Sequence, residues 1–288
     1  MDKARGRLEV IATPIGNLND LSPRARQALE QADLIAAEDT RHTLGMLQAL
    51  GISRPLVSVH AHNEPQRVPE ILERLAGGEV VALVSDAGMP LLSDPGFELV
   101  SSAARAGFEV RVVPGPSAVT AALAIAGLPT SRFCFEGFLP ARSRERRTHL
   151  AGLAQEVRTL VFFEAPHRIA ATLADLAQEF GEGRFAVVAR EMTKAHETIY
   201  RGTLAQLAQQ AASETNFQRG ELTVVVQGAA DVGGGVDSKL LRRAVELLSR
   251  ELPPGRAAAI AAQLTGATRS DAYALLTRAR EQPPGEEG

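Results

Sequence analysis

The sequence is poor in the features that mark several common protein classes. It has a single cysteine, Cys134, which argues against a disulfide framework or a thiolate metal cluster. No apolar run approaches the roughly 20 residues that a membrane-spanning helix needs. The opening residues, MDKARGRLEVIATP, show no signal-peptide core, and no histidine pair has the spacing of a zinc or iron site. These absences predict a cytoplasmic protein with no membrane segment and no bound metal.

Two phosphate-binding signatures are also missing. The chain has neither the Gly-x-Gly-x-x-Gly fingerprint of dinucleotide-binding folds nor a Walker-type Gly-Lys-Ser/Thr sequence. Its 31 basic and 34 acidic side chains give a net charge of −3. A negative net charge argues against a protein that binds nucleic acid over its whole surface. One basic cluster does exist, and it contains Arg142, Arg144, Arg146 and Arg147. It follows a strand-like run and is either a solvated helix face or a surface for a polyanion.

The first 127 residues alternate short apolar strands with helical segments. Helices are indicated at 23–32 and at 69–78, where a glycine pair marks the end of the second. The strand candidates lie at 8–12, 34–38, 56–60, 80–86 and 110–114. Continuous apolar strands separated by helices are typical of a mainly parallel sheet that is covered on both faces.

The pattern changes near residues 127–131. Helices are expected at about 166–180 and 203–213, and a second set of strand candidates lies at 133–138, 159–164, 185–191, 197–202 and 222–228. The gap between the third and fourth of these strands is too short for a crossover helix. This half is therefore predicted to contain a hairpin and a mixed sheet.

The last part of the chain has helical patterns and no strand candidates. A glycine-rich stretch at 230–237 predicts a flexible linker, and EQPPGEEG at 281–288 predicts a frayed end. Between them, Thr265-Gly266 predicts a helix stop, and Thr268 or Ser270 a new helix start. These helices are either a small bundle or a helix-turn-helix that contacts nucleic acid. The predicted fold is thus two α/β domains, at 1–127 and 128–230, followed by a linker and a C-terminal helical domain at 231–288.

Three loops rich in glycine and proline follow strands of the first predicted sheet, at 11–18, 85–96 and 112–117. Strand ends of open α/β sheets are where ligands bind. Gly88 permits a close approach of backbone to a ligand. Asp94, which precedes Pro95, is expected to cap the following helix. The three loops should line one rim of the sheet, where they form either a ligand site or structural turns that cap the following helices.

Seven segments of the chain resemble successive signature blocks of one enzyme family. They are ATPIGNL, AEDTRHT, SDAGMPLLSDPG, PGPSA, FFEAPHR, REMTKAHET and GELTVVV, in this order, within about residues 7–228. The family is that of the small-subunit ribosomal RNA 2′-O-methyltransferases, which are tetrapyrrole-methylase-like. Met192 stands where this family usually has Leu, and Met89 where Thr is common. Both differences are mild.

The resemblance implies a cytoplasmic homodimer that binds S-adenosylmethionine in a cleft between two α/β domains. It implies methylation of a cytidine ribose 2′-hydroxyl in the 16S RNA of the small ribosomal subunit. The cofactor-binding residues that it implies are Pro14, Ser85, Asp86, Ala87, Gly88, Ser93, Asp94, Ser117, Ala118, Phe163, Glu164, Leu222 and Thr223.

Transfer of a methyl group to a hydroxyl benefits from a group that accepts the hydroxyl proton. Glu38 and Asp39 of AEDTRHT are candidates, although this segment is also a plausible capped helix start. Lys194 is a third candidate if burial lowers its pKa, or else it pairs with Glu191 or Glu197. The expected RNA contacts come from Arg41, His42, Arg190, Lys194 and the cluster of Arg142, Arg144, Arg146 and Arg147.

Two other functions remain open at this point. The same fold and cofactor would serve a methyltransferase of a small molecule such as a tetrapyrrole, although such a substrate needs neither the arginine cluster nor the C-terminal helices. A ligand-sensing regulator that binds nucleic acid through those helices is the second. Residues 237–288 carry eight Lys/Arg and seven Asp/Glu, so they do not form a basic domain.

Overall fold

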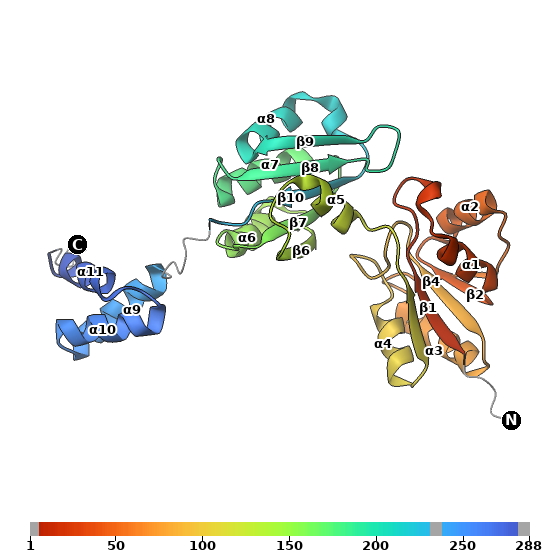
Figure 1. Ribbon diagram of the computed structural model, residues 1–288, viewed down its shortest axis with the longest axis horizontal. Helices are drawn as coiled ribbons and strands as arrows, with labels where there is room; N and C mark the ends of the chain where they lie inside the picture. Colours follow the sequence, from red (N-terminus) through yellow and green to blue (C-terminus); the bar gives the residue numbers. More distant parts are fainter. Residues whose placement is uncertain (1–5, 231–237, 282–288) are drawn as a thin grey trace. The chain divides into compact units, whose positions relative to one another are not determined.

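The computed structural model describes residues 6–230 and 238–281 of the chain. The chain divides into two compact units, one up to Ala229 and the other from Ala230 onward. The first unit contains two five-stranded sheets, and the second is helical (Figure 1). None of the described helices is long and apolar enough to span a membrane.

The first sheet is entirely parallel, with strand order β3-β2-β4-β1-β5. Its strands are β1 (Arg7–Ile11), β2 (Leu34–Ala37), β3 (Leu56–Ser58), β4 (Val80–Val84) and β5 (Glu109–Val113). All five predicted strands are therefore confirmed. A short 3₁₀ turn, η1 (Leu18–Asp20), follows β1.

Helices cover both faces of this sheet because its strands are apolar on both sides. On one face, α1 (Pro23–Gln31) and α2 (Thr40–Leu50) pack through a core that includes Leu29 and Leu47. On the other, α3 (Glu64–Ala76) and α4 (Phe97–Arg105) pack through Ile71 and Leu99. Helix α3 begins before the predicted start at residue 69, because Glu64-Pro65 already forms its first turn.

The second sheet has strand order β6-β7-β10-β8-β9 and is mixed, as predicted. Only β6 and β7 are parallel, and β8 and β9 form the expected antiparallel hairpin. The strands are β6 (Phe133–Phe138), β7 (Thr159–Glu164), β8 (Phe185–Arg190), β9 (Thr198–Thr203) and β10 (Leu222–Val226). One face packs against α6 (Ser143–Leu153), α7 (Ile169–Phe180), α8 (Leu204–Ser213) and the turn η2 (Thr215–Gln218).

Helix α5 (Ala118–Ala126) packs against the other face of the second sheet. Its Val119 and Leu123 share a core with Val161 of β7 and Val225 of β10. This helix precedes the predicted domain boundary after residue 127, and yet it packs into the core of the second sheet. The three-part division of the chain remains a prediction.

The loops that follow β1, β4 and β5 meet at one rim of the first sheet, as expected. Thr13 and Gly88 exchange two backbone hydrogen bonds, with N···O distances of 2.8 and 3.1 Å. Gly88 has φ of +80°, and a Cβ added there would lie 3.1 Å from the Ile15 side chain. The predicted cap at Asp94 is wrong: α4 begins at Phe97, and Gly96 with φ of +118° is its N-cap. Glycine is needed at that position because other residues rarely adopt a positive φ.

The second unit consists of α9 (Ser238–Glu251), α10 (Pro254–Thr265) and α11 (Arg269–Glu281). They share a small apolar core that includes Leu241, Ala258 and Leu276. Gly266 ends α10 with φ of +72°, and the Thr268 hydroxyl accepts a hydrogen bond from the Asp271 amide, as the predicted stop and restart require. The predicted linker and the predicted frayed end lie outside the described residues.

Candidate functional site

A cavity of about 440 Å³ lies beside the rim where the three loops meet. The first sheet contributes the loops after β1, β4 and β5, and the second contributes the ends of β6, β7 and β10. The lining residues are Ile15, Asp86, Ala87, Gly88, Met89, Leu92, Asp94, Ser117, Ala118, Phe138, Phe163, Glu164, Ala165, Pro166, Met192, Gly220, Glu221, Leu222 and Thr223. We call this space the first cavity.

One side of the first cavity is apolar and aromatic. The Phe163 ring packs edge-on against Phe135 at a centroid distance of 4.9 Å and lies tilted against Phe138 at 5.6 Å. Met192 and Leu222 line the same cavity. Such a wall suits a flat organic ring, and the cavity volume lies within the range of small-molecule sites.

The other side is polar, and one of its groups lacks a partner. The Ser117 hydroxyl oxygen is buried and has no hydrogen-bond partner among the described residues. Ser117 lines the cavity, as do the carboxylates of Asp86 and Asp94. Because buried polar groups are nearly always satisfied, the unpaired hydroxyl points to a polar ligand that completes this wall.

Acidic side chains gather where β2 and β4 end. Burial raises the pKa of Glu38 to about 7, and the nearby charges of Asp94 and Asp86 act in the same direction. Burial also raises the pKa of Asp94. Asp39 differs: the hydrogen bond from Arg41 lowers its pKa to about 2. Only one of the two predicted proton acceptors in this segment, Glu38, therefore titrates near neutral pH.

Ten of the thirteen expected cofactor-binding residues line the first cavity. The other three do not. Pro14 lies in a neighbouring cavity, Ser85 is buried behind the loop, and Ser93 is exposed near Gly137. The Ser85 hydroxyl faces the carbonyls of Ala87 and Gly88 at 3.4 Å, so its role in the structure is to shape the loop.

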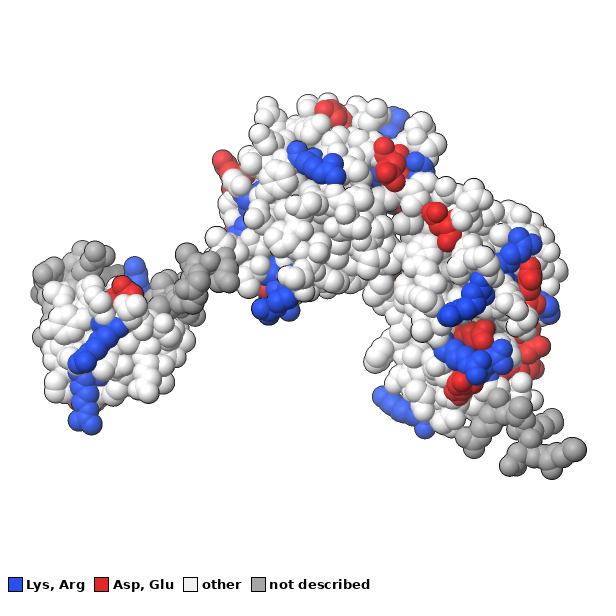
Figure 2. Space-filling view, viewed as in Figure 1, with Lys and Arg blue, Asp and Glu red and all other residues white. Residues whose placement is uncertain are grey.

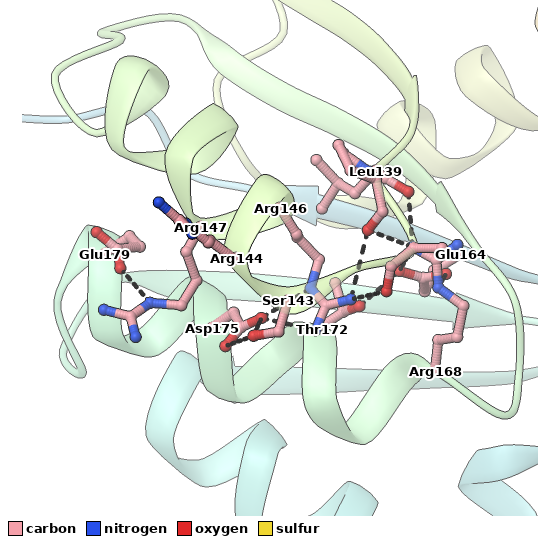
Figure 3. A network of polar contacts seen from close by, with 12 residues as sticks. Leu139, Ser143, Arg144, Arg146, Arg147, Glu164, Arg168, Thr172, Asp175 and Glu179 are labelled. Carbon is pink, nitrogen blue, oxygen red and sulfur yellow. Dashed lines mark hydrogen bonds and ion pairs between the residues drawn. The ribbon is translucent and has the colours of Figure 1, made fainter.

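Glu164 belongs to the cavity wall, but its carboxylate is used within the protein (Figure 3). It accepts hydrogen bonds from the Thr172 hydroxyl at 2.6 Å and from the Ala165 amide at 2.7 Å. Its other contact is an ion pair with Arg168, whose guanidinium also donates to the Leu139 carbonyl. Glu164 therefore fixes the turn after β7 and the end of β6, and both segments reach the cavity.

A second cavity, of about 730 Å³, adjoins the first. The two share a wall made of Ile15, Asp86, Ala87 and Glu221. The second cavity is also lined by Pro14, Gly16, Leu18, Arg41, His42, Gly45, Met46 and Lys194. The structure thus places three expected RNA contacts, Arg41, His42 and Lys194, around one space next to the first cavity.

Lys194 is an ion-pairing residue and not a neutral base. Its Nζ lies 3.0 Å from Glu191 Oε1 and 3.1 Å from Glu221 Oε2, and Glu197 is not its partner. Burial alone would lower the pKa of Lys194, but the hydrogen bonds to these two carboxylates outweigh burial and raise it. Of the two alternatives that the sequence left open, a lowered pKa or an ion pair with Glu191 or Glu197, the structure supports the ion pair with Glu191. A protonated Lys194 presents a cation to the second cavity.

The predicted arginine cluster divides into buried and exposed members (Figure 3). Arg146 points between α6 and α7, where its Nη2 lies 2.6 Å from Asp175 Oδ2 and its side chain is 4% exposed. Arg142 is 84% exposed, and Arg147 pairs with Glu179 at the surface. Arg144 and Arg147 line a shallow depression on α6. Arg146 holds two helices together and is not available to a polyanion.

The other expected RNA contacts differ in their exposure and in the protein groups that they already bind. The Arg41 side chain is 90% exposed and forms an ion pair with nearby Asp39. Arg190 donates to the carbonyls of Arg219 and His196, which ties together the loops that follow β8 and η2. On the face shown in Figure 2, basic side chains are interspersed with acidic ones and form no continuous basic surface.

Several residues that line the cavities were not predicted from the sequence. Met192 and Glu221 lie within segments that carry the family resemblance, so their position was the available signal, whereas Phe138 lies outside all of these segments. Gly45 and Met46 had no such signal, because their place at the second cavity depends on how α2 sits against distant loops. The described residues contain no group of three or more His, Cys, Asp or Glu placed to hold a metal ion.

Comparison with known proteins gives consistent matches. Residues 7–208 match the model of the tetrapyrrole (corrin/porphyrin) methylases, and residues 236–280 match that of the RsmI C-terminal HTH domain. Ribosomal RNA small subunit methyltransferase I of Xylella fastidiosa strain Temecula1 is 54% identical over 93% of this chain and 98% of its own length. The protein of the same name from Pseudomonas aeruginosa is 50% identical over 93% of this chain and 95% of its own length.

Solved structures share the fold at low sequence identity. A diphthine synthase matches with a TM-score of 0.60 at 19% identity, over 77% of this chain and 90% of its own. A cobalt precorrin-4 methyltransferase matches with a TM-score of 0.56 at 18% identity, over 77% of this chain and 94% of its own.

Proposed function

The chain belongs to the family of ribosomal RNA small subunit methyltransferase I, and on this premise we propose that it methylates RNA of the small ribosomal subunit. The methyl donor is S-adenosylmethionine, and the acceptor is the ribose 2′-hydroxyl of a cytidine in 16S RNA. One observation carries the proposal: the first cavity, suited to the cofactor, shares Asp86 with a second cavity flanked by Arg41 and Lys194.

The residues of the first cavity fit S-adenosylmethionine. The Phe163 wall suits the adenine ring, and the unpaired Ser117 hydroxyl suits a polar group of the cofactor. Asp86 and Asp94 supply negative charge for a ligand that carries a sulfonium and an ammonium group. When bound, the cofactor would supply a methyl group to the hydroxyl oxygen, and its sulfur would be the leaving group.

We assign the proton-accepting role to the carboxylates of Asp86 and Glu38. Asp86 faces both cavities, and Glu38 lies beside it with a pKa of about 7. A carboxylate that titrates near the working pH accepts a hydroxyl proton better than an ordinary one does. Asp39, with a pKa of about 2, is a weaker acceptor, so its proposed part is to cap α2 and hold Arg41.

The proposed RNA contacts are Arg41, His42, Lys194, the α6 N-cap residue Arg142, and Arg144 and Arg147 of α6. We do not include Arg146 and Arg190 among the RNA contacts, because their guanidiniums already bind groups of the protein. Arg146 pairs with Asp175, and Arg190 donates to two backbone carbonyls. With a net charge of −3, the protein needs such local cations to meet phosphate. Shape recognition of a folded RNA suits the small number of these cations.

We further propose that the protein acts in the cytoplasm, where ribosomal subunits are assembled, and that it is a homodimer. Phe97 and Val112 of the first unit, 74% and 53% exposed, are apolar residues that a partner subunit could cover.

The experiment that tests the activity compares two acceptors. Purified small ribosomal subunits that lack the modification, or a tetrapyrrole, are incubated with the protein and methyl-labelled S-adenosylmethionine. We expect label in the RNA alone. Label in the macrocycle would support the small-molecule methyltransferase instead. Calorimetric titration with S-adenosylmethionine gives a separate test of the cofactor, since a protein that does not bind it contradicts both assignments.

A further inference from the structure

Helix α2 has a glycine, Gly45, in its interior that local structure does not require. A Cβ added at Gly45 would meet nothing within 4 Å, so no neighbouring group needs the space. The residue also lacks the positive φ that favours glycine at helix ends such as Gly51. Glycine destabilises a helix interior relative to alanine. Gly45 therefore destabilises α2, and no contact among the described residues requires a glycine there.

Gly45 lies on the wall of the second cavity. Arg41, His42 and Met46 line the same cavity, and their spacing places all four residues on one face of α2. The missing side chain therefore widens the cavity at the middle of this face. Lys194, from the loop after β8, also lines the cavity.

The remaining groups of the second cavity match the parts of a nucleotide. Met46 and Leu18 offer apolar surface to a base. Arg41 and Lys194 offer cations to phosphate. The Glu221 side chain is 68% exposed, and a carboxylate there is suited to accept a hydrogen bond from an exocyclic amino group such as that of cytosine.

The wall shared by the two cavities indicates how such a nucleotide would be oriented. Asp86 and Ala87 line both cavities, so a ribose placed against them would lie next to the cofactor. The volume of about 730 Å³ is ample for one nucleoside with its phosphate. A base inside a helical stack cannot enter such a space and must first leave the stack.

We propose that the second cavity receives the target nucleoside, swung out of the RNA, and that Gly45 leaves the room its ring occupies. This assignment rests on the proposed function, since it names the place where the RNA substrate of that reaction binds.

The test replaces Gly45 by leucine. Gly152 provides a matched control, because it is also helical, also meets nothing within 4 Å at its Cβ position, and lines neither cavity. Three quantities are measured for Gly45→Leu, Gly152→Leu and the unchanged protein. They are the melting temperature, the affinity for S-adenosylmethionine, and the rate of methyl transfer to unmodified small subunits.

We expect Gly45→Leu to melt no lower than the unchanged protein and to keep its cofactor affinity. Its kcat/KM for subunits should fall by about 100-fold, since a reacting group displaced by an ångström loses about this much. Gly152→Leu should stay within about twofold of the unchanged protein. A Gly45→Leu protein that methylates subunits normally overturns the assignment. If the unchanged protein binds the cofactor but methylates no RNA, the proposed function itself fails, which is a distinguishable result.

Discussion

The backbone amide of Asp39 donates a hydrogen bond to the carboxylate of Asp86, with an N to Oδ1 distance of 3.1 Å. This bond joins the end of β2 to the end of β4, two neighbouring strands of the parallel sheet. It fixes the Asp86 side chain at the wall that both cavities share. The cofactor site and the proposed nucleoside site are thus connected through one oriented carboxylate.

Replacement of Asp86 by asparagine should weaken cofactor binding without unfolding the protein. Asparagine keeps an oxygen for the Asp39 amide but removes the charge that a cationic ligand meets. We expect the dissociation constant for S-adenosylmethionine to rise about tenfold, the effect of losing one charge-assisted hydrogen bond. Calorimetry measures the affinity, and the melting temperature is the control. Unchanged affinity would remove Asp86 from the cofactor site.

Glu38 should make the stability of the protein depend on pH. Its pKa is about 7 in the folded protein, above the ordinary 4.5 that it has when unfolded. Between these values the folded protein holds a proton that the unfolded chain has lost, so the stabilisation by this group falls as pH rises through this window. Glu38→Gln removes this pH dependence. Between about pH 5 and pH 8, the free energy of unfolding of the unchanged protein should therefore fall by about 2 kcal/mol relative to that of Glu38→Gln.

Urea unfolding at the two pH values measures this difference. Glu98→Gln, which changes an exposed carboxylate on α4, serves as the control for the loss of one negative charge. An equal pH slope for Glu38→Gln and for the unchanged protein would show that Glu38 is an ordinary surface acid.

The arginines of α6 should separate into structural and RNA-binding members. Arg146→Ala leaves Asp175 without its cationic partner, although the Ser143 hydroxyl still donates to it, and should lower the free energy of unfolding by about 3 kcal/mol. The double variant Arg144→Ala, Arg147→Ala should keep its stability, because its lost contacts lie at the surface.

The same double variant should bind small ribosomal subunits less tightly and with a weaker dependence on salt. Each lost phosphate contact lowers the slope of log affinity against log salt by about 0.7 to 0.9. Filter binding over a salt series measures the slope. An unchanged slope would mean that α6 does not face the RNA.

Lys194 should support RNA methylation through its charge and its position. Lys194→Gln leaves Glu191 and Glu221 without their shared cation, and kcat/KM for subunits should fall about tenfold, whereas Lys194→Arg should retain most activity. Gly16→Ala offers a second route to the same effect. Its Cβ would lie 2.5 Å from Lys194 Cγ and would displace the side chain. Full activity in both Lys194→Gln and Gly16→Ala would contradict the assignment.

Elements that depend on local pattern were predictable from the sequence. The strands of both sheets and the β8–β9 hairpin follow from short apolar runs and the gaps between them. The packing of α5 on the second sheet was not predictable, because the apolar helix has no feature that selects one sheet over the other. Asp94 failed as a helix cap because the backbone at Gly96, not a side-chain bond, sets the start of α4.

The candidate site shows the same division between local and distant information. The loops after β1, β4 and β5 could be placed at one rim because parallel strands end at the same edge. Arg146 could not be separated from its neighbours, since its partner Asp175 comes from another helix. For Lys194 the sequence left open a lowered pKa or an ion pair with Glu191 or Glu197. Its contact with Glu191 was within reach of sequence reasoning, whereas its contact with Glu221, a residue from beyond the second sheet's hairpin, was not.

The most direct test of the account is the identity of the methylated nucleoside. Small subunits lacking the modification are incubated with the protein and labelled S-adenosylmethionine, with Asp86→Ala as the control, and the RNA is then digested to nucleosides. The account predicts label in 2′-O-methylcytidine, and much less of it with Asp86→Ala. Label in a base-methylated nucleoside, or no label although the protein binds the cofactor, would contradict it.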